Sequence, residues 1–297
     1  MQAYKKRGFW VGLGVFFLVL LSPNPESLSP IGWAVAAVTL LMAIWWATEA
    51  VPVAVTALLP LALFPLLQVT DFKAAALPYA NPNIYLFMGG FILALGIESS
   101  GLHKRLALKM LILVGNSGAK LVGGFMLVSA LISMWVMNTS TTLMLLPIGL
   151  AVCTSVAETI PNFSAKQRKN FETSLLLGIA YAASIGGMST LVGTAPNIIF
   201  VGFMQETYGI EISFIDWMKL GVPIASIMLV ASWYTITQFV YPVNFVASME
   251  TKLQLRNMLT DLGPLGRDEK KVLVIFLFAA GAWMFRTLLD NLFLCLV

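Results

Sequence analysis

The sequence predicts an all-α protein that crosses a membrane several times. Apolar residues make up 59% of the 297 residues and charged residues only 11%, whereas a soluble domain is typically about half apolar and about one quarter charged. Long apolar stretches alternate with short basic loops, so too few polar side chains remain to cover a surface in water. The composition therefore excludes a soluble enzyme and a nucleic-acid-binding protein, despite a formal net charge of +4. Cys153 and Cys295 lie inside apolar stretches, without the spacing of a disulfide framework or a zinc site.

The first apolar stretch follows a basic N-terminus. Lys5, Lys6 and Arg7 precede the apolar residues 9–21, as in a secretory signal, but residues 22–26 contain no small-x-small cleavage site. We expect an uncleaved first transmembrane helix, which with its outer loop forms the segment 1–29.

Further apolar stretches predict further spans. A helix needs about 20 mostly apolar residues to cross a bilayer, and six stretches fit: 8–22, 30–48, 51–67, 81–99, 217–242 and 271–294. Two more apolar regions, 119–157 and 173–205, are interrupted. Interrupted helices at membrane depth are tolerated only where protein or a watery cavity satisfies the backbone, so these two regions are the candidates for a functional site.

The basic residues predict the orientation. With the N-terminus in the cytoplasm, all of the eighteen Lys and Arg residues fall in inside loops except Lys73, Lys219 and Arg286. Arg286 lies in the last span, four residues from Asp290, with which it would share a helix face. We expect a multi-pass protein of a bacterial-type inner or plasma membrane. This distribution of basic residues requires region 119–157 to enter and leave the membrane on the cytoplasmic side. It also requires region 173–205 to cross the membrane fully.

Region 119–157 predicts a re-entrant helical hairpin. Its apolar halves, 123–136 and 143–156, have fourteen residues each, and at 1.5 Å per residue each half reaches roughly 21 Å, too short to cross. The polar run 138–142 lies between them as the tip. Asn138 offers an amide donor to a carboxylate and an oxygen to a cation, while residues 140–142 could serve as helix caps alone. An ordinary span followed by a loop is the alternative.

Region 173–205 predicts a broken helix. A helical run over 173–185 meets the segment 186–197, which holds three glycines, a proline and an asparagine, and an apolar run over 198–204 completes the crossing. Pro196 removes a backbone donor and disfavours helix at the residue before it. We expect an unwound segment here; a glycine-rich helix in close packing is the alternative.

A hairpin tip that meets a broken helix at mid-membrane is a common way to build the substrate site of a secondary transporter. Helix N-termini attract anions, and unwound carbonyls and hydroxyls suit sodium. Neither interrupted segment contains Lys, Arg or His. A divalent anion would therefore need neutral donors, helix ends and co-bound cations to offset its desolvation.

Several motifs in one order carry a resemblance to a known family. They lie at 45–52, 86–91, 101–105, 138–139 and 184–197. In these stretches the chain resembles the divalent anion/sodium symporter family, the INDY-like di- and tricarboxylate transporters. The resemblance implies two inverted repeats, each with a Ser-Asn-Thr hairpin and a Gly-Thr-x-Pro-Asn broken helix. It also implies a homodimer that moves dicarboxylates, citrate or sulfate by an elevator-type motion.

The resemblance implies substrate contacts for five residues. Asn138 and Thr139 would contact a substrate carboxylate, while Thr194, Pro196 and Asn197 would shape the same pocket.

The resemblance also implies a first sodium site. Ser133, Asn138 and the Gly193 carbonyl would hold the ion. Met137 stands where the family has Ser and would contribute its backbone only, because a thioether is a poor sodium ligand. Sodium is the only coupling ion that we expect, and we expect no cofactor.

The expected organisation follows from these motifs. A first transporter repeat covers 30–260, with a cytoplasmic amphipathic helix at about 246–260, and 261–297 forms a linker and the first helix of a truncated second repeat. Because one hairpin motif and one broken-helix motif occur, we expect a carrier that lacks half of its site and is inactive alone.

The leading hypothesis is sodium-coupled symport of di- or tricarboxylates such as succinate, malate and citrate. The alternatives are a sodium-independent carboxylate exchanger, a sulfate carrier, and a non-transporting truncated membrane protein. The expected partners are the small anion, sodium, the lipid bilayer and, at full length, a second copy of the chain, but no nucleic acid.

Two charged positions are expected to be structural. Glu49 is predicted to be a capping or interface charge at a cytoplasmic helix junction. His103, beside Lys104 and Arg105, is predicted to lie on an interfacial helix over 101–114 with its charges toward water.

Overall fold

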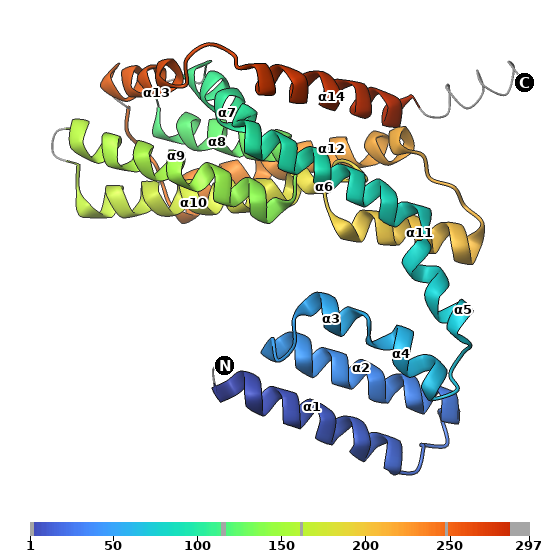
Figure 1. Cartoon of the computed structure of the whole chain (residues 1–297). Coiled ribbons are helices and arrows are strands. Elements are labelled where there is room, and N and C mark those ends of the chain that lie inside the picture. Colours follow the sequence, from blue (N-terminus) through green and yellow to red (C-terminus); the bar gives the residue numbers. More distant parts are fainter. Residues whose placement is uncertain (1–2, 114–116, 161–162, 247–248, 286–297) are drawn as a thin grey trace, which may run out of the picture. The chain divides into compact units, whose positions relative to one another are not determined.

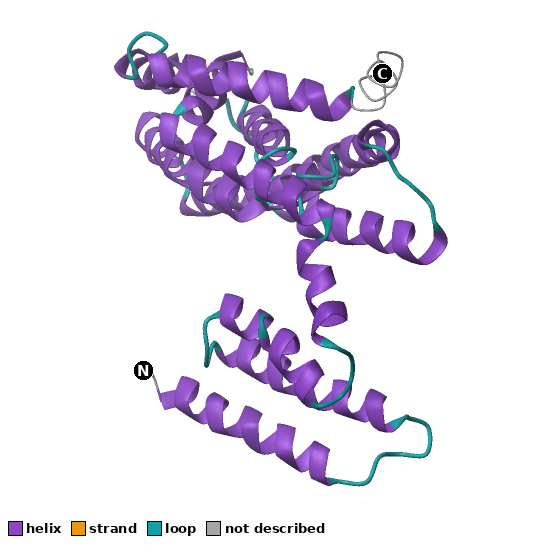
Figure 2. Ribbon diagram, turned by 45° about the vertical axis from the view of Figure 1, so that its right-hand side comes forward, coloured by secondary structure: helices purple, strands orange, loops and turns teal. Residues whose placement is uncertain are grey.

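The computed structural model describes residues 3–113, 117–160, 163–246 and 249–285, and within these ranges the regular elements are all helical (Figures 1 and 2). The predicted all-α fold class is confirmed. The chain divides into two compact units, a first over Met1–Ile84 and a second over Tyr85–Val297. The interrupted regions that are candidates for a site both belong to the second unit.

The first unit is built on two long helices that lie side by side (Figure 1). Phe16 and Val19 of one pack against Val38, Leu41 and Trp45 of the other. Its helices are α1 (Ala3–Leu21), α2 (Pro30–Thr48), α3 (Val53–Ala57), α4 (Leu59–Leu66), α5 (Phe72–Ala76) and the 3₁₀ helix η1 (Leu77–Ala80).

The expected single span over 51–67 is wrong, because two short helices occupy it. Helix α3 ends at Ala57 and α4 begins at Leu59, with Pro60 in its first turn. Proline has no N–H to continue a preceding helix, but it fits the first turn of a new one. The break at Leu58 therefore follows from the local sequence.

Glu49 has the structural role expected of it. It ends α2 in a left-handed conformation with φ of 46°, and its backbone N–H caps carbonyls of the last turn. Its carboxylate lies 2.8 Å from the Lys5 ammonium group of α1. The hydrogen bond and the charge of Lys5 lower the pKa of this exposed carboxyl group.

The second unit is a bundle around α8, α9 and α10, in which α10 packs along both of the others (Figure 1). Its largest fully buried side chains include Phe125, Leu145 and Phe171. The helices are α6 (Pro82–Ser100), α7 (Leu102–Leu113), α8 (Gly118–Ser133), α9 (Asn138–Thr159), α10 (Ala165–Gly187), α11 (Ala195–Tyr208), α12 (Phe214–Tyr234), the π-helix η2 (Thr235–Val240), α13 (Met249–Asp261) and α14 (Arg267–Met284).

Among the described residues, three helices are long and apolar enough to cross a membrane: Pro30–Thr48, Asn138–Thr159 and Phe214–Val240. The first and third lie where spans were expected at 30–48 and 217–242. Helix α14 covers part of the expected span 271–294, and Arg286 and Asp290 lie outside the described residues. Helix α13 occupies the region where an amphipathic helix was expected at about 246–260.

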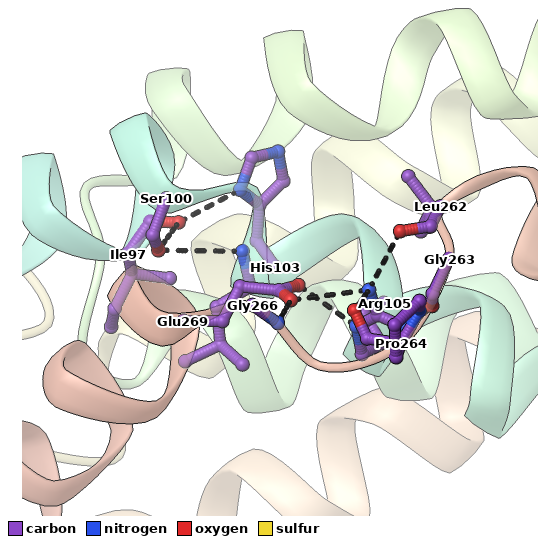
Figure 3. Close-up of polar contacts among 10 residues, drawn as sticks. Ile97, Ser100, His103, Arg105, Leu262, Gly263, Pro264, Gly266 and Glu269 are labelled. Atoms are coloured by element: carbon purple, nitrogen blue, oxygen red, sulfur yellow. Dashed lines mark hydrogen bonds and ion pairs between the residues drawn. The ribbon is translucent and has the colours of Figure 1, made fainter.

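Helix α7 was expected to turn its charges toward water, and this is wrong for His103 and Arg105. Their exposed fractions are only 3% and 6%. The guanidinium group of Arg105 pairs with the Glu269 carboxylate of α14 through Nε–Oε1 and Nη2–Oε2 distances of 2.8 and 3.1 Å (Figure 3). Its Nη atoms also donate to the carbonyls of the α13–α14 connection, at Leu262, Gly263 and Pro264.

The physical reason for this burial is that the two charged groups of the cluster, Arg105 and Glu269, find partners. Burying a charge is costly unless it is paired and hydrogen-bonded, and Arg105 meets both conditions. Glu269 also accepts from the Gly266 N–H at 2.7 Å. The His103 Nδ1 atom lies 3.1 Å from the Ile97 carbonyl oxygen (Figure 3), and burial lowers the pKa of this imidazole.

Candidate functional site

The hairpin tip is a tight turn between α8 and α9. Helix α8 ends at Ser133 and α9 begins at Asn138, so the turn consists of residues 134–137. The polar run 138–142, expected to form the tip, instead forms the first turns of α9. The reason lies in the backbone, because the Thr141 N–H already donates to the Met137 carbonyl at 2.9 Å.

The length argument for a re-entrant hairpin is therefore wrong for its second half. Helix α9 has 22 residues rather than fourteen, which corresponds to about 33 Å and is enough to cross. Helix α8 has 16 residues and remains short. Whether this hairpin enters and leaves on one side stays a prediction from the basic residues.

The second interruption lies between α10 and α11. Helix α10 ends at Gly187 and α11 begins at Ala195, so the break covers 188–194 and is shorter than the expected 186–197. Gly186 and Gly187 complete α10. Pro196 lies in the first turn of α11, where its missing N–H costs nothing.

The three strongest predicted sodium ligands meet where the tip touches the break. The Ser133 hydroxyl donates to Asn138 Oδ1 at 2.8 Å. A Cβ atom placed on Gly187 would overlap Asn138 Oδ1 and lie 3.2 Å from the Gly193 carbonyl oxygen. Both oxygens therefore border the Cα of Gly187, and any side chain at position 187 would fill the space between them.

Met137 contributes less than the other predicted ligands. Its side chain is exposed, and it caps α9 without a side-chain hydrogen bond. Its carbonyl, the one group expected to help, already accepts from the Thr141 N–H.

The predicted substrate residues differ in their surroundings. Thr139 and Pro196 are exposed, whereas Thr194 is half-buried. Asn197 is buried, and its amide nitrogen donates to the carbonyls of Gly187 at 3.0 Å and Thr190 at 2.7 Å. The Asn197 side chain therefore braces the break.

Two residues that sequence reasoning gave no role hold the break in place. The fully buried Thr190 hydroxyl donates to the Met134 carbonyl and accepts from the Gly193 N–H at 3.1 Å. Trp217 of α12 donates from its indole nitrogen to the Met188 carbonyl at 2.9 Å. The sequence could have indicated Thr190, because a hydroxyl side chain inside a glycine-rich break tends to hydrogen-bond to nearby backbone. No local pattern in the sequence indicates the role of Trp217.

The site is polar without being charged. Residues 133–142 and 186–197 contain no Asp, Glu, Lys, Arg or His. The N-cap residues of α9 and α11, Met137 and Thr194, make no side-chain capping bond. Among the described residues, the N–H groups of residues 138–140 at the start of α9 thus remain open to an anion, whereas in α11 Pro196 has no N–H and the Asn197 N–H donates to the Thr194 carbonyl at 3.2 Å.

The donor set suits a hard monovalent cation. Hydroxyl, amide and backbone oxygens are ligands for such ions, whereas imidazole and thiolate select transition metals. Across the described ranges, no group of three or more His, Cys, Asp or Glu side chains is placed to hold a metal ion.

Comparisons with known proteins identify the family to which the chain belongs. The family model described as the sodium:sulfate symporter transmembrane region matches residues 6–293. A protein of Staphylococcus saprophyticus named sodium-dependent dicarboxylate transporter SdcS is 39% identical over 287 residues, which are 95% of this chain and 54% of that protein. Its namesakes in Staphylococcus aureus strains USA300 and NCTC 8325 are 38% identical over 285 residues, with the same coverage. The chain spans about half the length of these curated relatives.

Proposed function

We propose that this chain, which belongs to the sodium:sulfate symporter family, supplies a sodium site and one end of a dicarboxylate site in a sodium-coupled secondary carrier. The observation that carries the proposal is the meeting of Ser133 Oγ, Asn138 Oδ1 and the Gly193 carbonyl around Gly187. The relatives' names point to transport rather than to catalysis.

Asn138 is the residue through which sodium and substrate would be coupled. Its Oδ1 faces Ser133 and Gly187, while its amide nitrogen is a donor that a carboxylate accepts from. A cation bound at Oδ1 places positive charge beside the N-terminus of α9, where no side chain caps the first N–H groups. Because the site has no charged side chain of its own, the cation lowers the cost of desolvating an anionic substrate there.

The proposed substrates are di- or tricarboxylates such as succinate, malate and citrate. Thr139 would add a hydroxyl donor beside Asn138, and Thr194 and Pro196 would line the same pocket at the start of α11. Sulfate offers the same divalent charge and is the competing substrate.

In the carrier, α8 and α9 form a re-entrant hairpin from the cytoplasmic side, and the N-terminus is cytoplasmic. Two copies of the carrier move their sites by an elevator-type motion through the lipid bilayer.

One observation favours a second candidate function, which is sodium-independent carboxylate exchange. The exposed thioether of Met137 offers no hard oxygen ligand. The backbone carbonyl of Met137 already accepts a hydrogen bond from the Thr141 N–H. A cation site with fewer ligands binds more weakly, and exchange needs no cation.

Uptake of labelled succinate into membrane vesicles containing the protein separates these functions. In a carrier that contains these residues, symport predicts uptake that is driven by inward sodium, abolished when choline replaces sodium, and inhibited more by malate than by sulfate. Uptake that is unchanged in choline would contradict coupling and favour exchange. Sodium binding without any uptake would show that the transporting unit needs more than these residues.

A further inference from the structure

Thr190 joins the two chain segments from which the proposed sodium ligands come. Its side chain is fully buried in the break between α10 and α11. The hydroxyl donates to the carbonyl of Met134 at the hairpin tip, and it accepts from the N–H of Gly193 within the break at 3.1 Å. One hydroxyl therefore bridges the tip and the break.

Both partners of this hydroxyl adjoin proposed sodium ligands. Met134 directly follows Ser133, and Gly193 carries the carbonyl that would bind the ion. The two segments are in close contact, because a Cβ atom placed on Gly193 would lie 3.0 Å from the Met134 carbonyl oxygen and 2.5 Å from that of Gly187. A small shift of one segment would therefore change the separation of the ligands.

Several backbone carbonyls of the break accept side-chain hydrogen bonds, but the Gly193 carbonyl is not one of them. Asn197 donates to the carbonyls of Gly187 and Thr190, and Trp217 donates to that of Met188. Among the described residues, no hydrogen bond reaches the Gly193 carbonyl oxygen. The bonds of the break thus fix its backbone and keep one acceptor available for a cation.

We infer that Thr190 is a positioning residue, whose hydroxyl holds the Gly193 carbonyl in register with Ser133 and Asn138 for sodium binding. The inference rests on the proposed sodium site. Thr190 does not touch the ion; it acts through the backbone on either side of it.

The chain offers a matched control at Ser129. Its side chain is also fully buried, and its hydroxyl donates from α8 to the Ile179 carbonyl of α10 at 2.8 Å. Removing the Ser129 hydroxyl deletes a buried link between α8 and α10, about one helical turn before Ser133 and outside both the tip and the break. A purely structural role for Thr190 would make the two deletions equivalent.

The test is the melting temperature of the purified chain in detergent, titrated with sodium chloride in place of choline chloride. A ligand that binds the folded state raises the melting temperature as its concentration increases. The melting temperature plotted against sodium concentration therefore gives the half-saturating concentration of sodium. The melting temperature in choline alone gives the stability of the protein without the ion. Thr190→Val should raise half-saturating sodium roughly tenfold, the effect of leaving a buried donor and acceptor unpaired. Thr190→Ser should keep the wild-type value. Ser129→Ala should lower the melting temperature in choline without moving the sodium curve.

The outcomes separate the inference from the function on which it rests. If the wild-type chain shows no sodium dependence, both are overturned. If it does, and Thr190→Val matches wild type or Ser129→Ala, only the inference fails. If Thr190→Val does not fold, amide hydrogen exchange of residues 188–194 in the wild-type protein tests the inference instead. Sodium should slow exchange of the Gly193 amide. Exchange that is unchanged by sodium overturns the inference.

Discussion

The α7–α14 junction and the hairpin-tip site are both polar and buried in the second unit, yet one is built from full charges and the other from neutral groups. At the junction, Arg105 and Glu269 form a paired couple, and three carbonyls accept further hydrogen bonds from the guanidinium group. At the site, Ser133 and Asn138 share one hydrogen bond beside a carbonyl that accepts none among the described residues. The junction is saturated, whereas the site keeps acceptors free.

The difference indicates what each cluster is for. A saturated ion pair fixes one geometry, because breaking it leaves an unpaired buried charge. Neutral oxygens with free lone pairs can exchange a hydroxyl partner for a cation at small cost. Substitutions at the junction, at the site and in the helices that carry them test this contrast.

Arg105→Ala should destabilise the chain most, by about 3–5 kcal/mol, because it leaves Glu269 buried and unpaired. Thermal or denaturant unfolding of the purified protein measures it. Lys271→Ala is the control, since its pair with Asp268 in the same helix is exposed and should contribute about 0–1 kcal/mol. Equal effects of the two substitutions would show that the junction is not a saturated pair.

Gly186→Ala should destabilise the α8–α10 contact by about 1–3 kcal/mol. A Cβ atom there would lie 2.5 Å from the Cα of Ala130, so a backbone must move. Gly281→Ala in α14 is the matched helix control. Apart from the adjoining backbone of α14 itself, no described atom lies within 4 Å of a Cβ atom placed there, and removing a helical glycine should stabilise by about 0.5–1 kcal/mol. A tolerated alanine at 186 would mean that the two helices are not in backbone contact.

Met137→Ser should stabilise the chain by about 1 kcal/mol, because α9 has no side-chain cap at this position and serine is among the best N-cap residues. Met137→Ala, which offers no capping oxygen, controls for loss of the methionine side chain. The same unfolding measurement applies. A serine variant no more stable than the alanine variant would contradict the described start of α9.

His103→Gln should flatten the dependence of stability on pH. Burial lowers the pKa of His103 from its ordinary value of 6.5, so the unfolded chain binds a proton that the folded chain does not. This contribution is complete above pH 6.5 and is lost as pH falls from there toward the folded pKa. Melting temperatures at pH 7.5, 6.5 and 5.5 should therefore fall more steeply for wild type than for the glutamine variant, which keeps a donor for the Ile97 carbonyl. Parallel curves would contradict the burial of a neutral imidazole.

The sequence supports local features better than long-range ones. The break after Gly187 and the turn before Asn138 follow from glycine, proline and polar residues close in the chain, although the backbone shifted the boundary of each. The meeting of Ser133, Asn138 and Gly193 was expected through the family resemblance. The Arg105–Glu269 pair joins residues 164 positions apart, and no local pattern marks such a partner, so Arg105 was wrongly expected to face water.

Equilibrium binding of ²²Na⁺ to the purified chain tests the central claim most directly, that neutral oxygens at the hairpin tip and the break hold sodium. We expect saturable binding that unlabelled sodium displaces and potassium does not. Ser133→Ala should weaken this binding roughly tenfold through the loss of one ligand, while Ser129→Ala, one turn earlier in α8, should leave it unchanged. Absence of saturable binding, or equal binding by the Ser133→Ala and wild-type chains, would contradict the account.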